Sequence, residues 1–163
     1  MVILPEVVKA SWFAGAETGD GVLLARHAPS QWSDPSFLTL AAASFGLQLG
    51  IQNTSILLVL RTPGALQSII KHQGKVGADF GATVVFYGMG AEAATTSNLG
   101  ADIVAFAAPN VGAYMGGSLE GSVLITRRDL NEAVYGVGAT PQGIIAGKRK
   151  SGIAQSLKHA LTR

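Results

Sequence analysis

Residues 45–52, with the sequence FGLQLGIQ, decide the fold class of this chain. Phe45, Leu47, Leu49 and Ile51 form one row of side chains, while glycine and glutamine form the other. This period of two is typical of a β-strand with one buried face. Half of the second row is glycine, which weakens a strand unless the sheet bends there or another element packs closely. The stretch therefore predicts a β-rich fold with strong curvature.

Pairs of glycines with one common spacing occur in this stretch and in two other predicted strands. Glycines stand four residues apart at 46 and 50, at 77 and 81, and at 117 and 121. Rows of glycine relieve crowding on the concave side of a bent sheet. We therefore expect an α+β domain: a strongly curved, mostly antiparallel sheet, open or closed into a barrel, with a few packed helices.

Composition limits the class of protein. The 163 residues are 48% hydrophobic and 13% charged, which is typical of a folded chain, and the length suits one domain over residues 1–163. The absence of cysteine excludes disulfides and thiolate metal sites. Residues 35–60 carry no charge and are long enough for a membrane-spanning helix. Their period-two pattern instead favours a hairpin that turns near residues 52–54.

Turn and capping residues predict the remaining elements. The Asp20-Gly21 pair predicts a hairpin turn within residues 18–21. A helix should begin after Thr62 and end before Gly74. Its buried stripe would consist of Leu66, Ile69 and Ile70.

Further along the chain, residues 76–86, 99–107 and 113–126 have the alternation of strands. A short helix is predicted within residues 126–136, with Thr126 and Asp129 as a capping pair and Gly136 at its end.

Charge is divided unevenly along the chain. Residues 1–136 hold seven basic and ten acidic residues, a net charge of −3, whereas residues 137–163 hold five basic residues and no acid. Apolar residues also recur at helical spacing in this tail, which predicts a basic amphipathic helix able to rest on an anionic membrane surface. The alternative is that the apolar residues dock on the sheet and the charges are solvated. The candidate lipid-binding residues are Lys148, Arg149, Lys150, Ile153, Leu157, Lys158 and Arg163.

Two patterns resemble reactive or cofactor sites but have simpler explanations. Residues 84–93 imitate a dinucleotide-binding loop, yet the next residues lack bulky side chains for a packed helix, and a hairpin connection is favoured. Asp79, Asp102 and Glu120 would form an acid–base or cation site only if their strand faces converge. Carboxylates in antiparallel strands more often face water.

No other side chains form a reactive pattern. His27, His72 and His159 have no metal-ligand spacing, which favours structural or surface roles, and residues 116–121 lack the second glycine of a nucleophile elbow. Trp12 and Trp32 are distant from the basic tail in sequence, which argues against nucleic acid as a partner. We expect no catalytic residue, no metal and no cofactor, and therefore a non-enzymatic protein.

Five segments in this order resemble the SYLF domain family, in its bacterial branch. They are LPEVVKASWFAGAETGDGVLLAR (4–26), FLTLAAASFGLQLGIQNTSILLVL (37–60), GADFGATV (77–84), NLGADIVAF (98–106) and GSLEGSVLI (117–125). The resemblance extends over residues 3–136. The N-terminal helical segment of the family is missing, and the loop at 108–115, which is often basic in the family, carries no charge here.

The resemblance implies a non-enzymatic domain that binds lipid or a membrane surface. Bacterial members are frequently exported, some as lipoproteins, which implies a periplasmic or membrane-anchored protein whose anchor lies outside this chain. Eukaryotic members bind phosphoinositides and actin and often carry a Src-homology-3 or FYVE module. The alternative is therefore a protein-interaction module, either actin-binding-like or structural in the cell envelope. The expected partner is an anionic phospholipid or membrane surface, and otherwise another protein.

Overall fold

A seven-stranded sheet forms the body of the protein. The computed structural model describes residues 1–11, 14–45, 50–72, 84–88, 102–111 and 122–162. Within these residues the strand order is β7-β8-β6-β1-β2-β5-β9, and every neighbouring pair is antiparallel except β7 and β8. The strands are β1 (Val2–Ser11), β2 (Ala14–Leu23), β5 (Ser36–Phe45), β6 (Gly50–Leu60), β7 (Val84–Gly88), β8 (Ile103–Val111) and β9 (Val123–Thr126). The predicted fold class is confirmed, and the sheet is open rather than closed into a barrel.

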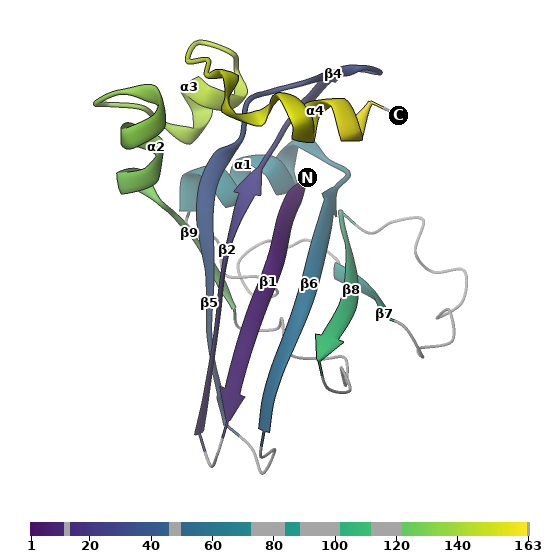
Figure 1. Cartoon of the computed structure of the whole chain (residues 1–163). Coiled ribbons are helices and arrows are strands. Elements are labelled where there is room, and N and C mark those ends of the chain that lie inside the picture. The colour runs from purple at the N-terminus through teal and green to yellow at the C-terminus, as the bar shows by residue number, and fades with distance from the viewer. Residues whose placement is uncertain (12–13, 46–49, 73–83, 89–101, 112–121, 163) are drawn as a thin grey trace.

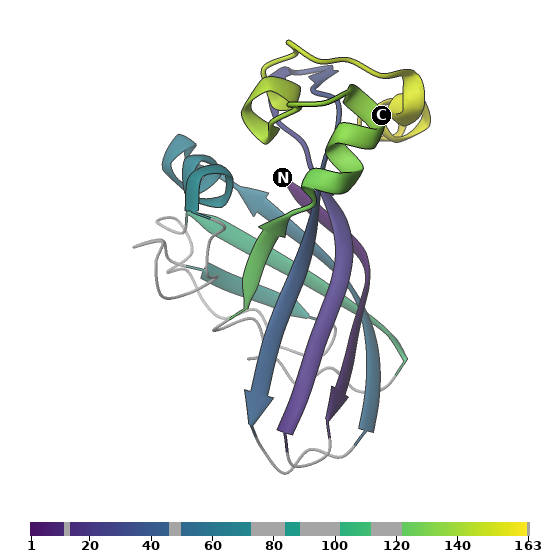
Figure 2. The same cartoon turned by 90° about the vertical axis from the view of Figure 1, so that its left-hand side faces the viewer.

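The smaller elements gather at one end of this sheet (Figure 1). They are the hairpin of β3 (Arg26–Ala28) and β4 (Gln31–Trp32), the helices α2 (Arg128–Tyr135), α3 (Pro141–Ile145) and α4 (Gln155–Leu161), and the 3-10 turn η2 (Gly152–Ala154). Helix α1 (Pro63–His72) lies apart from them, against the curved sheet (Figure 2).

Alternate residues of the strands form the core together with α1. Leu4, Leu40 and Leu58 are almost completely buried, and Ile69 and Ile70 of α1 pack in the same cluster. The predicted stripe of this helix is therefore confirmed. Thr62 also caps it as expected, because its hydroxyl oxygen accepts a hydrogen bond from the Ala65 amide at 3.2 Å. Position 74, where we expected the helix to stop, lies outside the described residues.

The predicted turn at residues 18–21 is wrong, because residues 14–23 form the single strand β2. Gly19 and Gly21 serve another purpose: they face a bulge where β1 shifts register against both β2 and β6. A Cβ on Gly19 would lie 2.5 Å from the backbone oxygen of Glu6, and one on Gly21 would lie closer still to that of Ile3. Glycine is therefore required here for the close approach of two strands.

The predicted hairpin at residues 52–54 is also wrong. Strand β6 runs through these residues; it pairs with β1 and β8, whereas β5 pairs with β2 and β9. Of the stretch 45–52, residue 45 ends β5, residues 50–52 belong to β6, and residues 46–49 lie outside the described part of the chain. None of the described helices is both long and apolar enough to span a bilayer.

The pairing of β7 with β8 corrects a third expectation. These strands are parallel, and a short hairpin cannot join parallel neighbours, so the hairpin connection predicted for residues 84–93 is wrong. Residues 89–93 themselves lie outside the described residues, as do the glycines at 77, 81, 117 and 121 and most of the strands predicted at 76–86 and 113–126.

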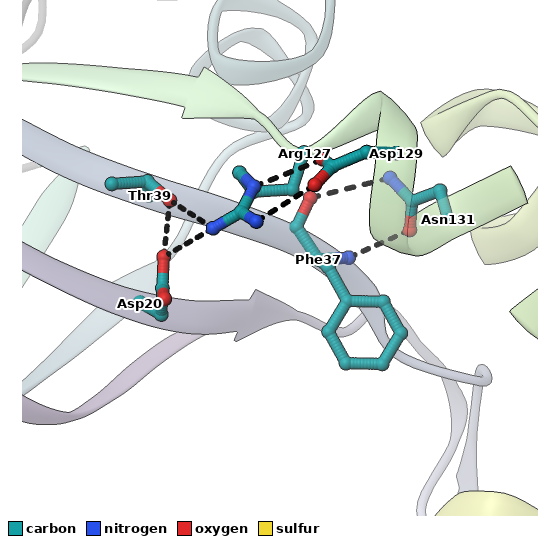
Figure 3. A network of polar contacts seen from close by, with 6 residues as sticks. All are labelled: Asp20, Phe37, Thr39, Arg127, Asp129 and Asn131. Atoms are coloured by element: carbon teal, nitrogen blue, oxygen red, sulfur yellow. Dashed lines mark hydrogen bonds and ion pairs between the residues drawn. The ribbon is translucent and has the colours of Figure 1, made fainter. Parts of the chain in front are cut away.

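Helix α2 is fixed to the sheet by polar contacts (Figure 3). Asn131, which is completely buried, accepts a hydrogen bond from the Phe37 amide at 2.8 Å and donates one to the Phe37 carbonyl at 3.2 Å. Arg127 forms two hydrogen bonds with Asp129, at 2.9 and 2.7 Å, and an ion pair with Asp20 at 3.0 Å. The hydrogen bond from Arg127 lowers the pKa of Asp129 to about 2.

The start of α2 differs from the prediction, although its existence and its end at Gly136 are confirmed. The N-cap residue is Arg127, without a side-chain capping bond, so Thr126 and Asp129 do not form the expected capping pair. The carboxylate of Asp129 binds the arginine instead, and this arginine connects the β9–α2 junction to β2.

Candidate functional site

The C-terminal tail lies along the β3–β4 hairpin (Figure 1). Trp32 Nε1 donates a hydrogen bond to the carbonyl of Leu161 at 3.2 Å. His27 Nε2 donates one to the carbonyl of Ile145 at 2.7 Å, since a carbonyl oxygen can only accept. Trp32 is therefore adjacent to the tail in the fold despite its distance in sequence.

A buried carboxylate, that of Asp34, holds the tail at two points. Its Oδ1 accepts from Lys158 Nζ at 2.5 Å and its Oδ2 accepts from the Ser151 amide at 2.7 Å. A buried charge is tolerated when it is paired and hydrogen-bonded. Next to it, Tyr135 donates to the Pro35 carbonyl at 2.7 Å, and burial, with the nearby Asp34 charge, raises the pKa of Tyr135 to about 12.

Two of the basic residues predicted to bind lipid are engaged within the protein. Lys158 forms the ion pair with Asp34, and Arg149 Nη1 donates to the carbonyl of Tyr135 at 3.2 Å. Arg163 lies outside the described residues. The tail therefore presents fewer available charges than its sequence indicates.

The other predicted lipid-binding residues differ in exposure. The Ile153 side chain is 63% exposed, and a second apolar residue, Val137, is 86% exposed. Lys148 and Lys150 are also exposed, whereas Leu157 is half-buried. The predicted terminal helix is confirmed as α4, and this helix has no fully buried residue.

The hairpin and the tail together surround a polar cavity of about 810 Å³, which we call the tail cavity. This volume lies within the range of natural ligand sites. Its titratable and aromatic lining residues are His27, Trp32, Asp34, Lys150, Lys158 and His159. Sequence spacing did not connect the two histidines, because the fold alone brings residues 27 and 159 to one cavity. No group of three or more potential metal ligands occurs among the described residues.

A second hollow, which we call the sheet groove, is apolar and has a volume of about 560 Å³. It lies over β1, β6 and β8, and its lining includes Ile3, Leu57, Phe106 and Leu161. Phe106 is 43% exposed. Because Leu161 belongs to α4, this helix contributes side chains to both hollows.

The acidic residues give no sign of a reaction centre in the described part of the chain. Asp79 and Glu120 lie outside that part, so the convergence of the three predicted acids stays untested. Asp102 precedes β8, and its carbonyl accepts from the Arg61 amide at 2.8 Å. A different acid, Glu17, is 4% exposed on the inner face of β2. Burial raises the pKa of Glu17 against the opposing attraction of Lys9, so ionisation of this group disfavours the folded state.

Removing the Lys158 charge tests the docking of the tail. We expect Lys158→Ala to weaken that docking by about 1–3 kcal/mol, because it leaves a buried carboxylate without its cation. This is less than for a fully buried pair, since the Lys158 side chain is 24% exposed. Hydrogen exchange of residues 151–162, followed by mass spectrometry, should become roughly ten- to hundredfold faster. Lys148→Ala, an exposed control in the same tail, should leave exchange unchanged; equal exchange in both variants would contradict this role of Lys158.

Comparison with known proteins decides the family. The family model described as "Las17-binding protein actin regulator", Ysc84, matches residues 41–163. The chain belongs to the Ysc84 family. This confirms the SYLF resemblance, which refers to the same family.

Several curated proteins are similar to this Ysc84 chain. LAS seventeen-binding protein 3 of Saccharomyces cerevisiae is 31% identical over 144 residues, which are 87% of this chain and 31% of the relative. SH3 domain-containing YSC84-like protein 1 of Xenopus laevis is 30% identical over 131 residues, 80% of this chain and 39% of the relative. The chain thus spans well under half the length of these relatives. No significant match was found among solved structures.

These relatives bear on the expectations of function. The family description names Las17 binding and actin regulation, and the yeast relative is named as a binding protein rather than an enzyme, so the non-enzymatic prediction is confirmed. The relatives named here come from yeast and a vertebrate. Export from a bacterium and lipid binding therefore stay predictions.

Proposed function

We propose that this Ysc84 domain is a protein-interaction module whose partner belongs to the actin-regulating machinery. The observation that carries the proposal is the family match over residues 41–163, in a family described by Las17 binding and actin regulation. The matched range includes the end of β5, all of β6 and β8, and the entire tail. It therefore contains the tail side of the tail cavity and the β6 and β8 side of the sheet groove.

The two hollows support a protein partner. Helix α4 borders both hollows: Lys158 lines the polar tail cavity, and Leu161 lines the apolar sheet groove. Protein interfaces combine an apolar centre with a polar, hydrogen-bonding rim. A surface with this composition suits a folded or extended polypeptide better than it suits a small apolar ligand.

Direct binding measurements test the proposal. Immobilised yeast Las17 should retain the purified domain, and actin filaments free of lipid should co-sediment with it in a saturable manner. Bovine serum albumin serves as the unrelated protein control. If neither Las17 nor actin filaments bind the domain in a saturable manner at concentrations up to about 100 μM, the proposal is removed. That concentration is about 100 times the dissociation constant of a micromolar complex.

A membrane surface is the second candidate, and the exposure of two apolar side chains favours it. The segment from α2 to α4, which lies at one end of the molecule (Figure 1), carries the exposed apolar side chains of Val137 and Ile153 and the exposed Lys148 and Lys150. In this mechanism the basic residues are attracted to anionic headgroups, each contributing roughly 1 kcal/mol, and the apolar residues then enter the interface.

Pelleting with vesicles distinguishes this candidate. The domain should sediment with vesicles of anionic phospholipid and not with neutral vesicles, and added salt should weaken binding. The double variant Lys148→Glu, Lys150→Glu should abolish sedimentation. Unchanged sedimentation of that variant would rule out the assignment to these residues, and no sedimentation of the unaltered domain would rule out the membrane candidate itself.

A further inference from the structure

We infer that the tail cavity binds carboxylate side chains from an acidic segment of the protein partner. The inference rests on the proposed function, because it names the part of the partner that this cavity recognises.

The single acid among the described lining residues does not repel an anion from the cavity. Asp34 is buried, and its two carboxylate oxygens are taken by Lys158 Nζ and by the amide of Ser151. An ion pair with an added amide donor presents little net negative charge to a ligand. Lys150, which is exposed and also lines the cavity, therefore leaves the cavity with an uncompensated positive charge.

The histidines add donors that can face an anion. His27 Nε2 is committed to the carbonyl of Ile145, so its other ring nitrogen is the one available for a ligand. His159 lies on α4 next to Lys158 and is exposed. An imidazole N–H at either position can donate a hydrogen bond to a carboxylate oxygen.

The surroundings of the cavity strengthen its preference for anions. Residues 24–34 and 137–162 carry five Lys or Arg residues and a single carboxylate, and these segments lie together at one end of the molecule (Figure 1). Charge of one sign around a concave site concentrates the field within it. The concentration of basic residues at this end therefore includes the β3–β4 hairpin as well as the tail.

The shape of the site favours a peptide over a bilayer. A bilayer surface is broad and would meet the protruding Val137 and Ile153 first, neither of which lines the cavity. An extended peptide can place a carboxylate inside the cavity while its backbone uses the hydroxyl and amide groups at the rim, such as those of Ser30 and Gln155. Hydrogen-bonding groups of this kind give specificity to a polar site.

Calorimetric titration of the whole chain with an octamer of glutamate tests the inference. An octamer of glutamine is the neutral control and should bind at least tenfold more weakly. Lys150→Glu should weaken binding of the glutamate peptide at least tenfold, and His159→Ala at least threefold. Lys148→Glu, which makes the same charge change two residues away and outside the cavity lining, should weaken binding less than threefold. All three side chains are exposed, so the variants should keep the thermal unfolding midpoint of the parent.

Several outcomes would contradict the binding of carboxylates in the tail cavity. Equal losses in Lys150→Glu and Lys148→Glu would show diffuse attraction and overturn the cavity assignment. Failure of the glutamate peptide to bind, while Las17 or actin filaments still bind, would overturn this inference and leave the proposed function standing. Failure of all three would remove both. Lys150-dependent binding of anionic vesicles without any binding of the peptide would overturn the inference in favour of the membrane candidate.

Discussion

Replacing Gly21 by alanine is expected to lower the free energy of unfolding by about 3 kcal/mol, at the upper end of the range for overpacked positions. The new Cβ would collide with the backbone oxygen of Ile3 and lie 2.7 Å from Leu4 Cδ2. A backbone atom in a paired strand cannot move aside as the end of a flexible side chain can. Urea denaturation followed by circular dichroism measures the loss.

A second glycine provides the matched control. Gly64 lies in the first turn of α1, and within the described part of the chain a Cβ there would meet only the hydroxyl of Thr62, at 3.9 Å. Gly64→Ala should therefore leave stability unchanged or raise it by up to about 1 kcal/mol, since alanine favours a helix. Gly19→Ala should destabilise in the same way as Gly21→Ala. If all three variants unfold at the same urea concentration, the close approach of β1 and β2 does not constrain these positions.

The glycines of β2 illustrate which parts of this fold could be predicted. Helix α1 has its signals within the helix itself, in Thr62, Pro63 and the spacing of Ile69 and Ile70, and it was predicted correctly. The Asp20-Gly21 pair is an equally local signal for a turn. In the structure, however, both residues lie within β2, where glycine accommodates the bulge of the neighbouring strand β1. Without knowledge of the partner strand, a glycine that permits close approach cannot be distinguished from one that permits a turn.

For a similar reason, local sequence signals could not predict which strands pair. Alternation places residues on a strand, and it predicted most of β5 and β6. It does not say which strand lies next to which, and all three predicted hairpins assumed that neighbours in sequence pair with each other. In the structure β6 pairs with β1 and β8, and β7 pairs in parallel with β8.

The candidate site was predicted in part. The basic, amphipathic character of the tail is a property of the tail alone, so α4 and its charges could be identified from sequence. The ion pair between Asp34 and Lys158 joins residues 124 positions apart, and the fold determines it. The same contact explains why the charge of the tail overstates what is available to a partner.

The side chain that attaches α2 to the sheet should also contribute strongly to the free energy of unfolding. Asn131→Ala is expected to lower the free energy of unfolding by about 2–3 kcal/mol, because it leaves the partly buried Phe37 amide without an acceptor. The Phe37 carbonyl keeps the hydrogen bond from the Arg127 amide at 3.0 Å. The groups that lose a partner are therefore the Phe37 amide and the buried Ser36 hydroxyl, which accepts from Asn131 Nδ2 at 3.3 Å. Chemical denaturation gives the energy, and hydrogen exchange of the Phe37 amide should become faster.

Two further variants separate this role from a general effect of changing α2. Asn131→Asp retains an acceptor for the Phe37 amide but loses both donors and buries a charge, so it should be at least as harmful as alanine. Arg128→Ala changes a side chain that is 80% exposed and paired only at the surface with Glu132, and should cost less than about 0.5 kcal/mol. Because α2 leads directly into α3, whose last residue Ile145 receives the hydrogen bond of His27, loss of the Asn131 contacts should also loosen the tail. Exchange in residues 151–162 that stays as slow in Asn131→Ala as in Arg128→Ala would contradict this coupling of the sheet to the site.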